Sequence, residues 1–281
     1  MNIDNILRVQ PNFIQSYNSY IELGQEFLKS QKVAIVGLAR NVELILKNNI
    51  IKIINCFSIA QDYRLFIFEN DSTDNTKNIL KTATETNEKI KFYTENYNRK
   101  QYGTTKEKER TQALAEYRNI CVNWIHNNCA DYDFIIVMDL DFFDFSINGC
   151  YNSFGWLKEN NQIDGIAGNS FELKKIFNDK IDLWNYDSWA FRGTWWEDSM
   201  KYLGSIYDYN PMLWFGFWIP PIGSIPIKVN SAFGGMTIYR TGKFISGVYS
   251  GDDCEHVCFH YDLKQKTNFN LYLNPSQRML V

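Results

Sequence analysis

The sequence predicts an α/β protein built on a central, mostly parallel sheet with helices on both faces. Two observations support this prediction. Four short runs rich in β-branched and aromatic residues alternate with helix-like segments between residues 32 and 139, and polar clusters directly follow the second and fourth runs. Strands that alternate with helices usually pair in parallel, because each helix returns the chain to the same end of the sheet. The 281 residues, 45% of them hydrophobic, suffice for a substantial core.

The predicted elements alternate regularly as far as residue 139. From about Ile3 to Leu28 a mixed polar and apolar segment has helix-compatible spacing, so we expect a peripheral helix there. Beyond it the sequence predicts strands at residues 32–37, 63–68, 89–93 and 133–139, and helices at 41–57, from 74 onward and at 106–126. Ser72 or Thr73 is a candidate N-cap of the second of these helices, because a hydroxyl oxygen accepts from free backbone N–H groups.

The second half of the chain is less regular. Residues 183–226 are rich in Trp, Tyr, Phe, Gly and Pro without clear periodicity, so we expect an irregular, aromatic-rich region of loops and short elements. We expect a glycine turn entering a strand at 233–240 and a short helix or loop at 252–263. No linker or repeat divides the chain. We therefore predict an N-terminal helical extension, 1–31, and a single domain, 32–281, with its two halves meeting near residue 145.

Composition excludes several classes of protein. The formal net charge of −3 gives no overall attraction to nucleic acid. The first thirty residues lack the basic start and apolar core of a secretory signal, and the longest apolar window, 213–219, is too short to span a bilayer. Six scattered cysteines do not form the dense framework of a small secreted domain, so we expect mostly free thiols. We expect a soluble, cytoplasmic protein without a transmembrane segment.

Two carboxylates, Asp139 and Asp141, directly follow the buried run Phe134–Val137. Side chains two residues apart in an extended segment point the same way, so these two acids project together. Carboxylates so close repel each other, and a shared Mn²⁺ or Mg²⁺ ion relieves that repulsion. The alternative is a solvated loop with incidental acids. The placement after a buried strand favours a metal site that also binds phosphate.

Other polar residues follow the first two strands. Glu69, Asn70 and Asp71 offer acceptors and donors suited to a nucleobase or ribose, although a polar helix cap is the favoured explanation when this group is taken alone. The turn that contains Gly37, Leu38 and Arg40 lets backbone and guanidinium approach a phosphate, or is an ordinary strand-to-helix turn.

The long helix predicted at 106–126 contains two arginines on nearly one face, Arg110 and Arg118. Arg118 and the following Asn119 are candidates to reach the same anion as Arg40. A pair of arginines on a helix surface is the alternative.

Two of the three histidines lie in the run Cys254–His260. A zinc site of Cys and His ligands is disfavoured, because four ligands within seven residues lack the usual intervening loop. The better interpretation makes His260 a further ligand of the carboxylate-bound metal and Glu255 or His256 a proton acceptor. Structural histidines remain the alternative.

Glycines and tryptophans mark the remaining candidates. Gly234 and Gly235 allow a close backbone approach to a ligand, or simply form a turn. The tryptophans of the irregular region offer planes on which sugar rings stack, although most of them are expected in the core; they are Trp184, Trp189, Trp195, Trp196, Trp214 and Trp218.

The sequence resembles the nucleotide-sugar half of GT-A fold glycosyltransferases in four segments that occur in the expected order: Gly37–Asn41, Glu69–Thr76, Tyr117–Asn119 and Asp139–Asp141. Three later segments resemble a branch found in giant viruses, bacteria and some eukaryotes, distantly similar to the fungal CAP-type capsular mannosyltransferases: Tyr186–Arg192, Ser231–Gly235 and Cys254–His256. The resemblance covers about residues 32–275. It implies a Rossmann-like GT-A fold and, for a viral member, a location in the host cytoplasm or the virion.

The resemblance also implies roles for individual residues. Asp139 and Asp141 would bind Mn²⁺ or Mg²⁺ on the donor diphosphate, with Asp141 as the direct ligand. Glu69 and Asn70 would contact base and ribose, although the commonest inverting families have Asp-Asp where this sequence has Glu-Asn.

On the acceptor side, the resemblance places Gly234 and Gly235 near the acceptor and makes Glu255 the base of an inverting reaction. His260, or else His256, would complete the metal shell.

We therefore predict a metal-dependent glycosyltransferase that moves a hexose from a nucleotide diphosphate sugar, UDP- or GDP-linked, to a hydroxyl of a glycan or protein acceptor. Glu255 and His256 are its catalytic candidates. A sugar-phosphate nucleotidyltransferase is disfavoured, because the turn after the first strand has one glycine and one cation where those enzymes usually have a glycine-rich basic loop. A non-catalytic carbohydrate-binding protein is the other alternative.

Overall fold

The computed structural model describes residues 2–103, 107–175, 181–195 and 214–281. The chain divides into two compact units. One, here called the parallel unit, comprises Leu28–Phe142 and Ile238–Asn268; the other, the mixed unit, comprises Met1–Phe27, Phe143–Thr237 and Phe269–Val281. Within the described ranges, none of the helices combines the length and apolarity needed to cross a membrane.

The parallel unit contains the four strands that the sequence predicts. They are β1 (Lys32–Ala39), β2 (Asp62–Asn70), β3 (Ile90–Glu95) and β4 (Phe134–Asp139). They lie in the order β3-β2-β1-β4, and every neighbouring pair is parallel. This order confirms the predicted parallel sheet.

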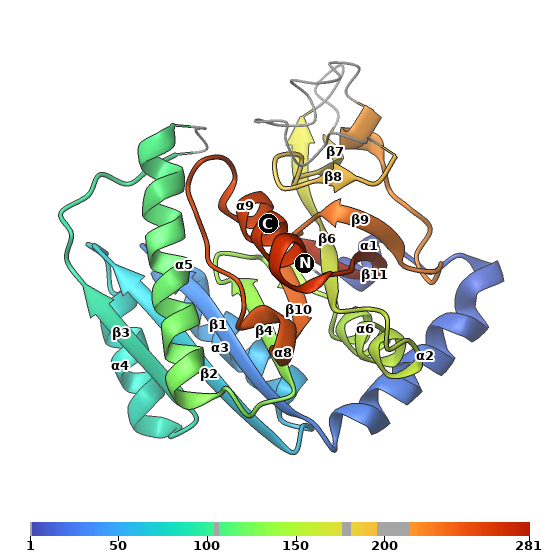
Figure 1. Cartoon of the computed structure of the whole chain (residues 1–281), viewed down its shortest axis with the longest axis horizontal. Helices are drawn as coiled ribbons and strands as arrows, with labels where there is room; N and C mark the ends of the chain where they lie inside the picture. The colour runs from blue at the N-terminus through green and yellow to red at the C-terminus, as the bar shows by residue number, and fades with distance from the viewer. Residues whose placement is uncertain (1, 104–106, 176–180, 196–213) are drawn as a thin grey trace. The chain divides into compact units, whose positions relative to one another are not determined.

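Helices cover both faces of these strands. α5 (Lys108–Asn128) crosses one face, while α3 (Glu43–Phe57) and α4 (Thr76–Thr86) lie on the other (Figure 1). Two further helices, α8 (Thr241–Phe244) and α9 (Glu255–Thr267), belong to the same unit, and α9 packs against α5. The predicted helix at 106–126 is thus confirmed as α5, although residue 106 lies outside the described residues.

The pairing register brings the polar strand ends together at one edge of the sheet. Leu38 of β1 pairs with Asp139 of β4, and the next β1 residue, Ala39, pairs with Glu69 of β2. Gly37 is required for this packing, because a β-carbon there would lie 2.6 Å from the backbone oxygen of Met138. In an α/β sheet this carboxyl edge is where ligands bind.

The predicted hydroxyl cap of α4 is wrong. The helix begins at Thr76, and its N-cap residue, Asn75, makes no capping side-chain bond. Asp74 instead accepts from the backbone N–H of Thr76 at 3.0 Å and from that of Glu43 at 3.0 Å. A carboxylate thus accepts hydrogen bonds at the starts of two helices, whereas the Ser72 hydroxyl accepts from the N–H of Asn41 at 3.0 Å.

The mixed unit is built around two long parallel strands, β6 (Gly165–Lys175) and β11 (Leu271–Leu280). Shorter strands pair antiparallel at their sides: β5 (Asp144–Phe145) and β9 (Ile227–Ser231) with β11, β7 (Ile181–Asn185) with β6, and β8 (Arg192–Gly193) with β9. The unit also contains α6 (Ile147–Glu159), the 3-10 helix η4 (Trp214–Phe217) and the first two residues of β10 (Met236–Arg240), whose other three residues belong to the parallel unit. The expected short elements and the strand after the glycine turn are present, whereas the sequence did not indicate β6 and β11.

The N-terminal segment is part of the mixed unit. It consists of α1 (Ile3–Ile6), the 3-10 turn η1 (Pro11–Phe13) and α2 (Ile14–Leu28), because Pro11 interrupts the single helix that the spacing predicts. Two glycines, Gly24 of α2 and Gly155 of α6, let the helices touch, since a β-carbon on either would lie within about 2.1 Å of a backbone oxygen of the other helix.

Arg278 ties the N-terminal segment to β11. Its side chain is 1% exposed, pairs with Asp4 at 2.6 Å and donates to the backbone oxygen of Leu7. We expect Arg278→Ala to lower the free energy of unfolding by about 1–3 kcal/mol, because it removes the donor to the buried backbone oxygen of Ser276 and the partner of the partly exposed Asp4. Urea denaturation measures this loss. Arg8→Ala, a change at an exposed arginine of the same segment, is the control, and equal effects of the two changes would contradict the assignment.

Candidate active site

Three charged side chains in contact with one another link the end of β4 to the start of α9. Arg118, on α5, donates from Nη2 to Asp139 Oδ1 at 2.7 Å, and its Nε lies 4.0 Å from Glu255 Oε1. Arg118 is only 4% exposed. Burial alone would lower its pKa, but the two carboxylates raise it above the usual arginine value, so it remains a cation. The structure thus joins three predicted site residues from three separate elements.

Asp141 differs from Asp139 in its surroundings. Its side chain is exposed to solvent, yet the protein atoms around it, and then the Asp139 carboxylate, raise its pKa to about 6. The loop that carries it is fixed by Asn49 of α3, whose Nδ2 donates to the backbone oxygens of Leu140 at 2.9 Å and Phe142 at 2.8 Å. Sequence reasoning missed Asn49; a polar residue on the buried face of a predicted helix was the available signal.

The start of α9 places Glu255 and His256 side by side. His256 Nε2 lies 3.6 Å from Glu255 Oε1, and both side chains are buried. Burial raises the pKa of Glu255, and the Arg118 guanidinium opposes part of that rise. Burial, Arg118 and His260 together hold the pKa of His256 well below its usual value, so its imidazole is neutral. A carboxylate with a raised pKa beside a neutral imidazole is suited to accept a proton.

His260 lies deeper in the same helix. It is fully buried, and its Nε2 lies 2.8 Å from the hydroxyl oxygen of Tyr239. Among the residues that the structure describes, no three Asp, Glu, His or Cys side chains form a group that could hold a metal ion. The prediction that His260 joins Asp139 and Asp141 as a metal ligand therefore gains no support from the arrangement of side chains.

Burial lowers the pKa of His260 to about 3. Because its pKa is lower in the folded than in the unfolded chain, the folded state resists protonation, and His260 costs stability as pH falls below about 6.5. We expect His260→Gln to lose less stability than the wild type between pH 7 and pH 5, by on the order of 1 kcal/mol per pH unit. The pKa values of Asp141 and Glu255 are raised, so these two carboxylates favour the folded state as pH falls. They do so in the wild type and in the variant alike. Urea unfolding at several pH values measures the difference; identical slopes would contradict it.

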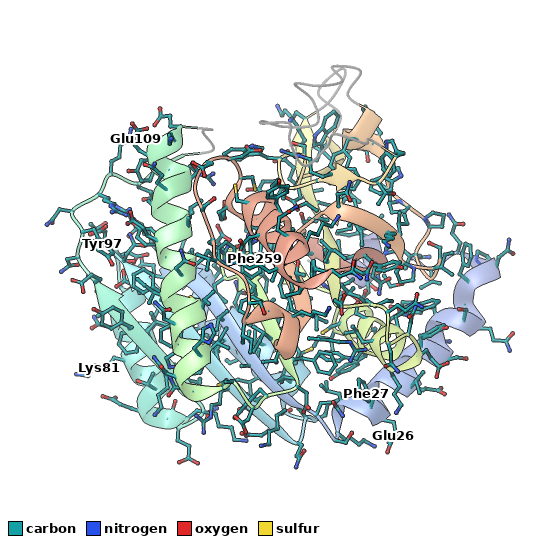
Figure 2. The ribbon with its side chains drawn as sticks, in the orientation of Figure 1. Glu26, Phe27, Lys81, Tyr97, Glu109 and Phe259 are labelled. Atoms are coloured by element: carbon teal, nitrogen blue, oxygen red, sulfur yellow. The ribbon has the colours of Figure 1, made fainter. Side chains whose placement is uncertain are left out.

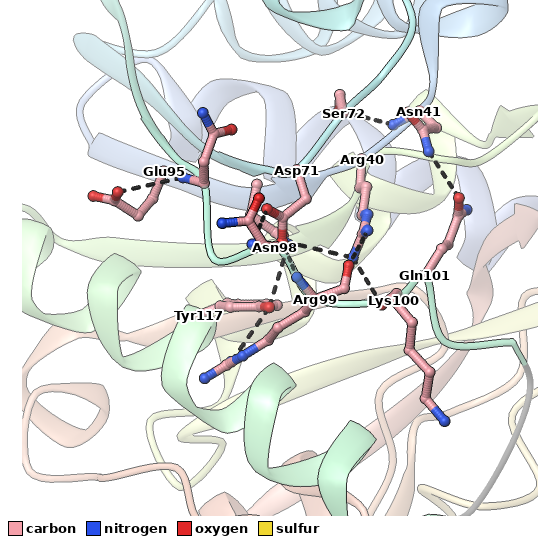
Figure 3. A network of polar contacts seen from close by, with 12 residues as sticks. Arg40, Asn41, Asp71, Ser72, Glu95, Asn98, Arg99, Lys100, Gln101 and Tyr117 are labelled. Atoms are coloured by element: carbon pink, nitrogen blue, oxygen red, sulfur yellow. Dashed lines mark hydrogen bonds and ion pairs between the residues drawn. The ribbon is translucent and has the colours of Figure 1, made fainter.

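Arg40 holds a strap of chain that follows β3, residues 95–101 (Figure 3). Its guanidinium donates to the backbone oxygens of Arg99 at 2.6 Å and Lys100 at 3.1 Å. Asp71, whose Oδ2 lies 3.9 Å from Arg40 Nη1, holds the same strap, because its Oδ1 accepts from the N–H of Asn98 at 2.8 Å. The Arg40 guanidinium thus binds backbone carbonyl oxygens in this structure, whereas the sequence suggested that it binds a phosphate.

The polar residues that follow β2 make hydrogen bonds to one another and to neighbouring segments. Glu69 is 0% exposed and accepts from the backbone N–H of Ser72 at 2.8 Å and from the hydroxyl of Thr94. Asn70 donates to Asp71 at 3.1 Å and to the hydroxyl oxygen of Tyr117 at 3.2 Å. The Glu69 carboxylate therefore stabilises the turn after β2 through hydrogen bonds within the fold.

Asp71, the third residue of the predicted nucleobase- or ribose-binding group, has an unusual backbone. It adopts a left-handed backbone with φ of 52°. Burial alone would raise its pKa, but hydrogen bonds from Asn70 and the strap, together with Arg40, hold the pKa below its usual value. A non-glycine residue in this conformation directly after a strand often marks a functional site, but the sequence does not reveal the conformation.

Gly234 and Gly235 form the turn before β10 in the mixed unit. Their φ angles are 59° and 71°, and a β-carbon on Gly234 would lie 2.1 Å from the oxygen of Gly168. Asp187 accepts from the N–H groups of Phe233 at 3.0 Å and Gly234 at 2.5 Å. The predicted glycine turn is therefore present, and a carboxylate fixes it.

The structure describes only some of the tryptophans that were candidates for stacking on sugar rings. Trp184 is buried at 8% exposure, whereas the Trp195 side chain is 60% exposed. The Trp195 ring lies over Gly193, whose added β-carbon would come within 2.6 Å of it. Trp196 and the side chain of Trp214 lie outside the described residues.

Comparison with known proteins finds similarity at the level of the fold. No family model and no curated protein sequence matches the chain. Among solved structures, it resembles GalNAc-T7 crystallised with UDP, GalNAc and Mn²⁺, with a TM-score of 0.53 and 12% identity over 98% of this chain and 53% of that one. It also matches the mannosyltransferase PcManGT of Pyrobaculum calidifontis, in complex with GDP-Man and Mn²⁺, with a TM-score of 0.49 and 10% identity over 96% of this chain and 65% of that one.

A third structural match is TarS 1-349 of S. aureus in complex with UDP-GlcNAc, with a TM-score of 0.47 and 12% identity over 89% of this chain and 58% of that one. The chain thus spans between about half and two thirds of the length of these structures. The similarity to GalNAc-T7 confirms the predicted GT-A-type fold, a mostly parallel central sheet flanked by helices.

Proposed function

We propose that the chain is a metal-dependent glycosyltransferase that moves a hexose from a nucleotide diphosphate sugar to an acceptor hydroxyl. The observation that carries this proposal is the pair of ionic contacts at the carboxyl edge of the parallel unit, in which Arg118 joins Asp139 of β4 to Glu255 of α9. A binding protein has no evident need for a buried carboxylate whose pKa is raised beside a fixed cation, whereas a transferase uses both.

The donor set fits a divalent cation that arrives with a phosphate. Asp139 and Asp141 supply two carboxylates. Burial, and then the charge of Asp139, raise the pKa of Asp141, and a bound cation would offset both effects. Mg²⁺ and Mn²⁺ sites often use one or two protein carboxylates, with substrate phosphates and waters filling the other positions. When bound, the ion supplies Lewis-acid stabilisation of the departing diphosphate.

The residues of this chain orient the reaction and move a proton. Arg118 fixes one oxygen of Asp139 and keeps a positive charge beside both carboxylates. In an inverting reaction the Glu255 carboxylate accepts the proton of the acceptor hydroxyl, and in a retaining reaction it binds the sugar or acceptor. The neutral imidazole of His256 packs beside Glu255 and limits its orientation.

The donor nucleotide is assigned to the ends of β1 and β2. Asn70 and Asp71 offer an amide and a carboxylate beside the Tyr117 hydroxyl, which suits the polar edge of a base or a ribose. We propose a UDP- or GDP-linked donor, a glycan or protein acceptor, and a cytoplasmic location. The distant similarity to CAP-type mannosyltransferases belongs to the same proposal.

A thermal-shift panel tests the binding half of this function. UDP, GDP, CMP and their sugar conjugates are each added with and without Mn²⁺. One nucleotide is expected to stabilise the protein only with Mn²⁺, by about 2.7 kcal/mol at a hundred times its dissociation constant. Asp131→Asn, a change at an exposed surface acid, should keep this shift. Equal shifts with and without Mn²⁺, or none with any nucleotide, would contradict the proposal.

A further inference from the structure

The backbone of Tyr249 is fixed by an asparagine from α5. Asn119 Nδ2 donates to the backbone oxygen of Tyr249 at 2.9 Å, and the N–H of Tyr249 donates to Asn119 Oδ1 at 3.0 Å. Thr111, also on α5, donates to the backbone oxygen of Gly251 at 2.7 Å. These bonds hold the segment that leads into α9. Asn119 therefore positions this segment, although the sequence suggested that it reaches an anion.

The ring of Tyr249 is equally constrained. It stacks on Phe259, with ring centroids 4.1 Å apart and planes 10° from parallel, and it meets the edge of His256 at 5.7 Å and 79°. Phe259 is a buried residue of α9, labelled in Figure 2. Tyr249 itself is 3% exposed. With backbone and ring both held, its hydroxyl oxygen has a defined position.

The hydroxyl of Tyr249 makes no hydrogen bond to any part of the chain that the structure describes. A buried hydroxyl in that situation is costly, because it has lost water without gaining a partner, and such groups are rare in folded proteins. A phenylalanine would keep both ring contacts. Tyr239, in the same unit, shows the ordinary arrangement, since its hydroxyl pairs with His260 at 2.8 Å.

The Tyr249 side chain lies beside the proposed reacting groups. Its ring meets the ring of His256 at 5.7 Å, and His256 Nε2 in turn lies 3.6 Å from Glu255 Oε1. A sugar hydroxyl suits the position, since its oxygen can accept from Tyr249 while its proton is donated to Glu255.

We propose that Tyr249 is a substrate-binding residue, whose hydroxyl donates to a sugar hydroxyl that occupies the site beside Glu255. This inference rests on the proposed glycosyltransferase function. It assigns the substrate contact to a residue outside all the motifs that the sequence suggested.

The test is Tyr249→Phe, which removes one oxygen atom and keeps the ring. We expect its rate of sugar transfer to fall about 10- to 100-fold, while its melting temperature is unchanged or higher, because the hydroxyl has no partner to lose in the described chain. Tyr239→Phe, which breaks the bond to His260, should lower the melting temperature. Tyr261→Phe, at an exposed position of α9, should transfer at the wild-type rate.

Three outcomes would overturn the inference, and one of them also overturns the proposed function. If the wild type transfers sugar and Tyr249→Phe transfers equally fast, Tyr249 makes no substrate contact, but the proposed function stands. If the wild type transfers no sugar from any nucleotide donor with Mn²⁺, the function fails and the inference fails with it. A clear fall in melting temperature for Tyr249→Phe would also contradict it, because it would show that the hydroxyl serves the fold.

Discussion

Asp141→Asn is expected to reduce sugar transfer by about 100-fold or more and to abolish the Mn²⁺-dependent binding of the nucleotide. Asparagine keeps the size of the side chain but removes the charge that the proposed cation needs. The rate of nucleotide diphosphate release, measured with saturating donor and Mn²⁺, checks the loss.

The same change is expected to leave the fold equally stable or more stable. The pKa of Asp141 is raised to about 6 in the folded protein, so its ionised form opposes folding at neutral pH. Removing the charge removes this opposition, and the difference between the two proteins should vanish once pH falls below the unfolded value of about 3.9. If Asp141→Asn binds the nucleotide as tightly as the wild type does, the carboxylate pair is no metal site.

Glu255→Gln is expected to slow transfer by about 10²- to 10⁴-fold, the usual contribution of a general base. Glutamine keeps the shape of the side chain but cannot accept the proton of the acceptor hydroxyl. The nucleotide should still bind with Mn²⁺, because Asp139 and Asp141 are unchanged, so kcat falls while the thermal shift persists.

The pH profile provides a second measurement of the role of Glu255. Burial raises the pKa of Glu255, so the wild-type kcat/KM should decline on acidification at a pH above the ordinary glutamate value of 4.5. Glu255→Gln should lose the part of this decline that Glu255 causes, while protonation of Asp141, whose pKa is raised to about 6, contributes in both proteins. A variant that retains most of the activity would exclude proton transfer and leave Glu255 a role in binding the sugar or the acceptor.

The parallel unit was predictable because its pattern is local. Each of β1, β2 and β4 is a nearly continuous buried run, and the pairing rules for alternating strands and helices then determine that polar strand ends share one edge. Asp139 and Asp141 could be identified for that reason. The contact of Arg118 with both Asp139 and Glu255 could be seen only in the structure, since these residues come from three elements far apart in sequence.

The mixed unit was less predictable because its strands bury polar residues. β11 contains Asn274 and Gln277, both almost completely buried, and their amides donate to other elements of the unit: Asn274 to Asn152 at 3.0 Å and Gln277 to the backbone oxygen of Met236 at 2.8 Å. A strand stabilised by such bonds shows no hydrophobic alternation. The hydrogen-bond partners of this strand are brought together only by folding, so the sequence does not identify them.

The site residues that sequence reasoning missed share one property. Asn49 and Tyr249 owe their roles to long-range hydrogen bonds, with two carbonyls around Asp141 and with the amide of Asn119. The sequence gives a signal only for Asn49, a polar residue on the buried face of a predicted helix. Glu69 shows the converse, because its type suggested ligand contact while the fold uses its carboxylate internally.

Turnover of a nucleotide sugar tests the central claim most directly. The protein is incubated with UDP- and GDP-hexoses, with and without a mixture of sugar acceptors, in Mn²⁺ or in EDTA, and the released nucleotide diphosphate is quantified. The proposal predicts release from one nucleotide class that requires Mn²⁺, increases with a suitable acceptor and is lost in Asp141→Asn. Release that is equal in EDTA, or no release from any donor at enzyme concentrations where the nucleotide demonstrably binds, would contradict a metal-dependent glycosyltransferase.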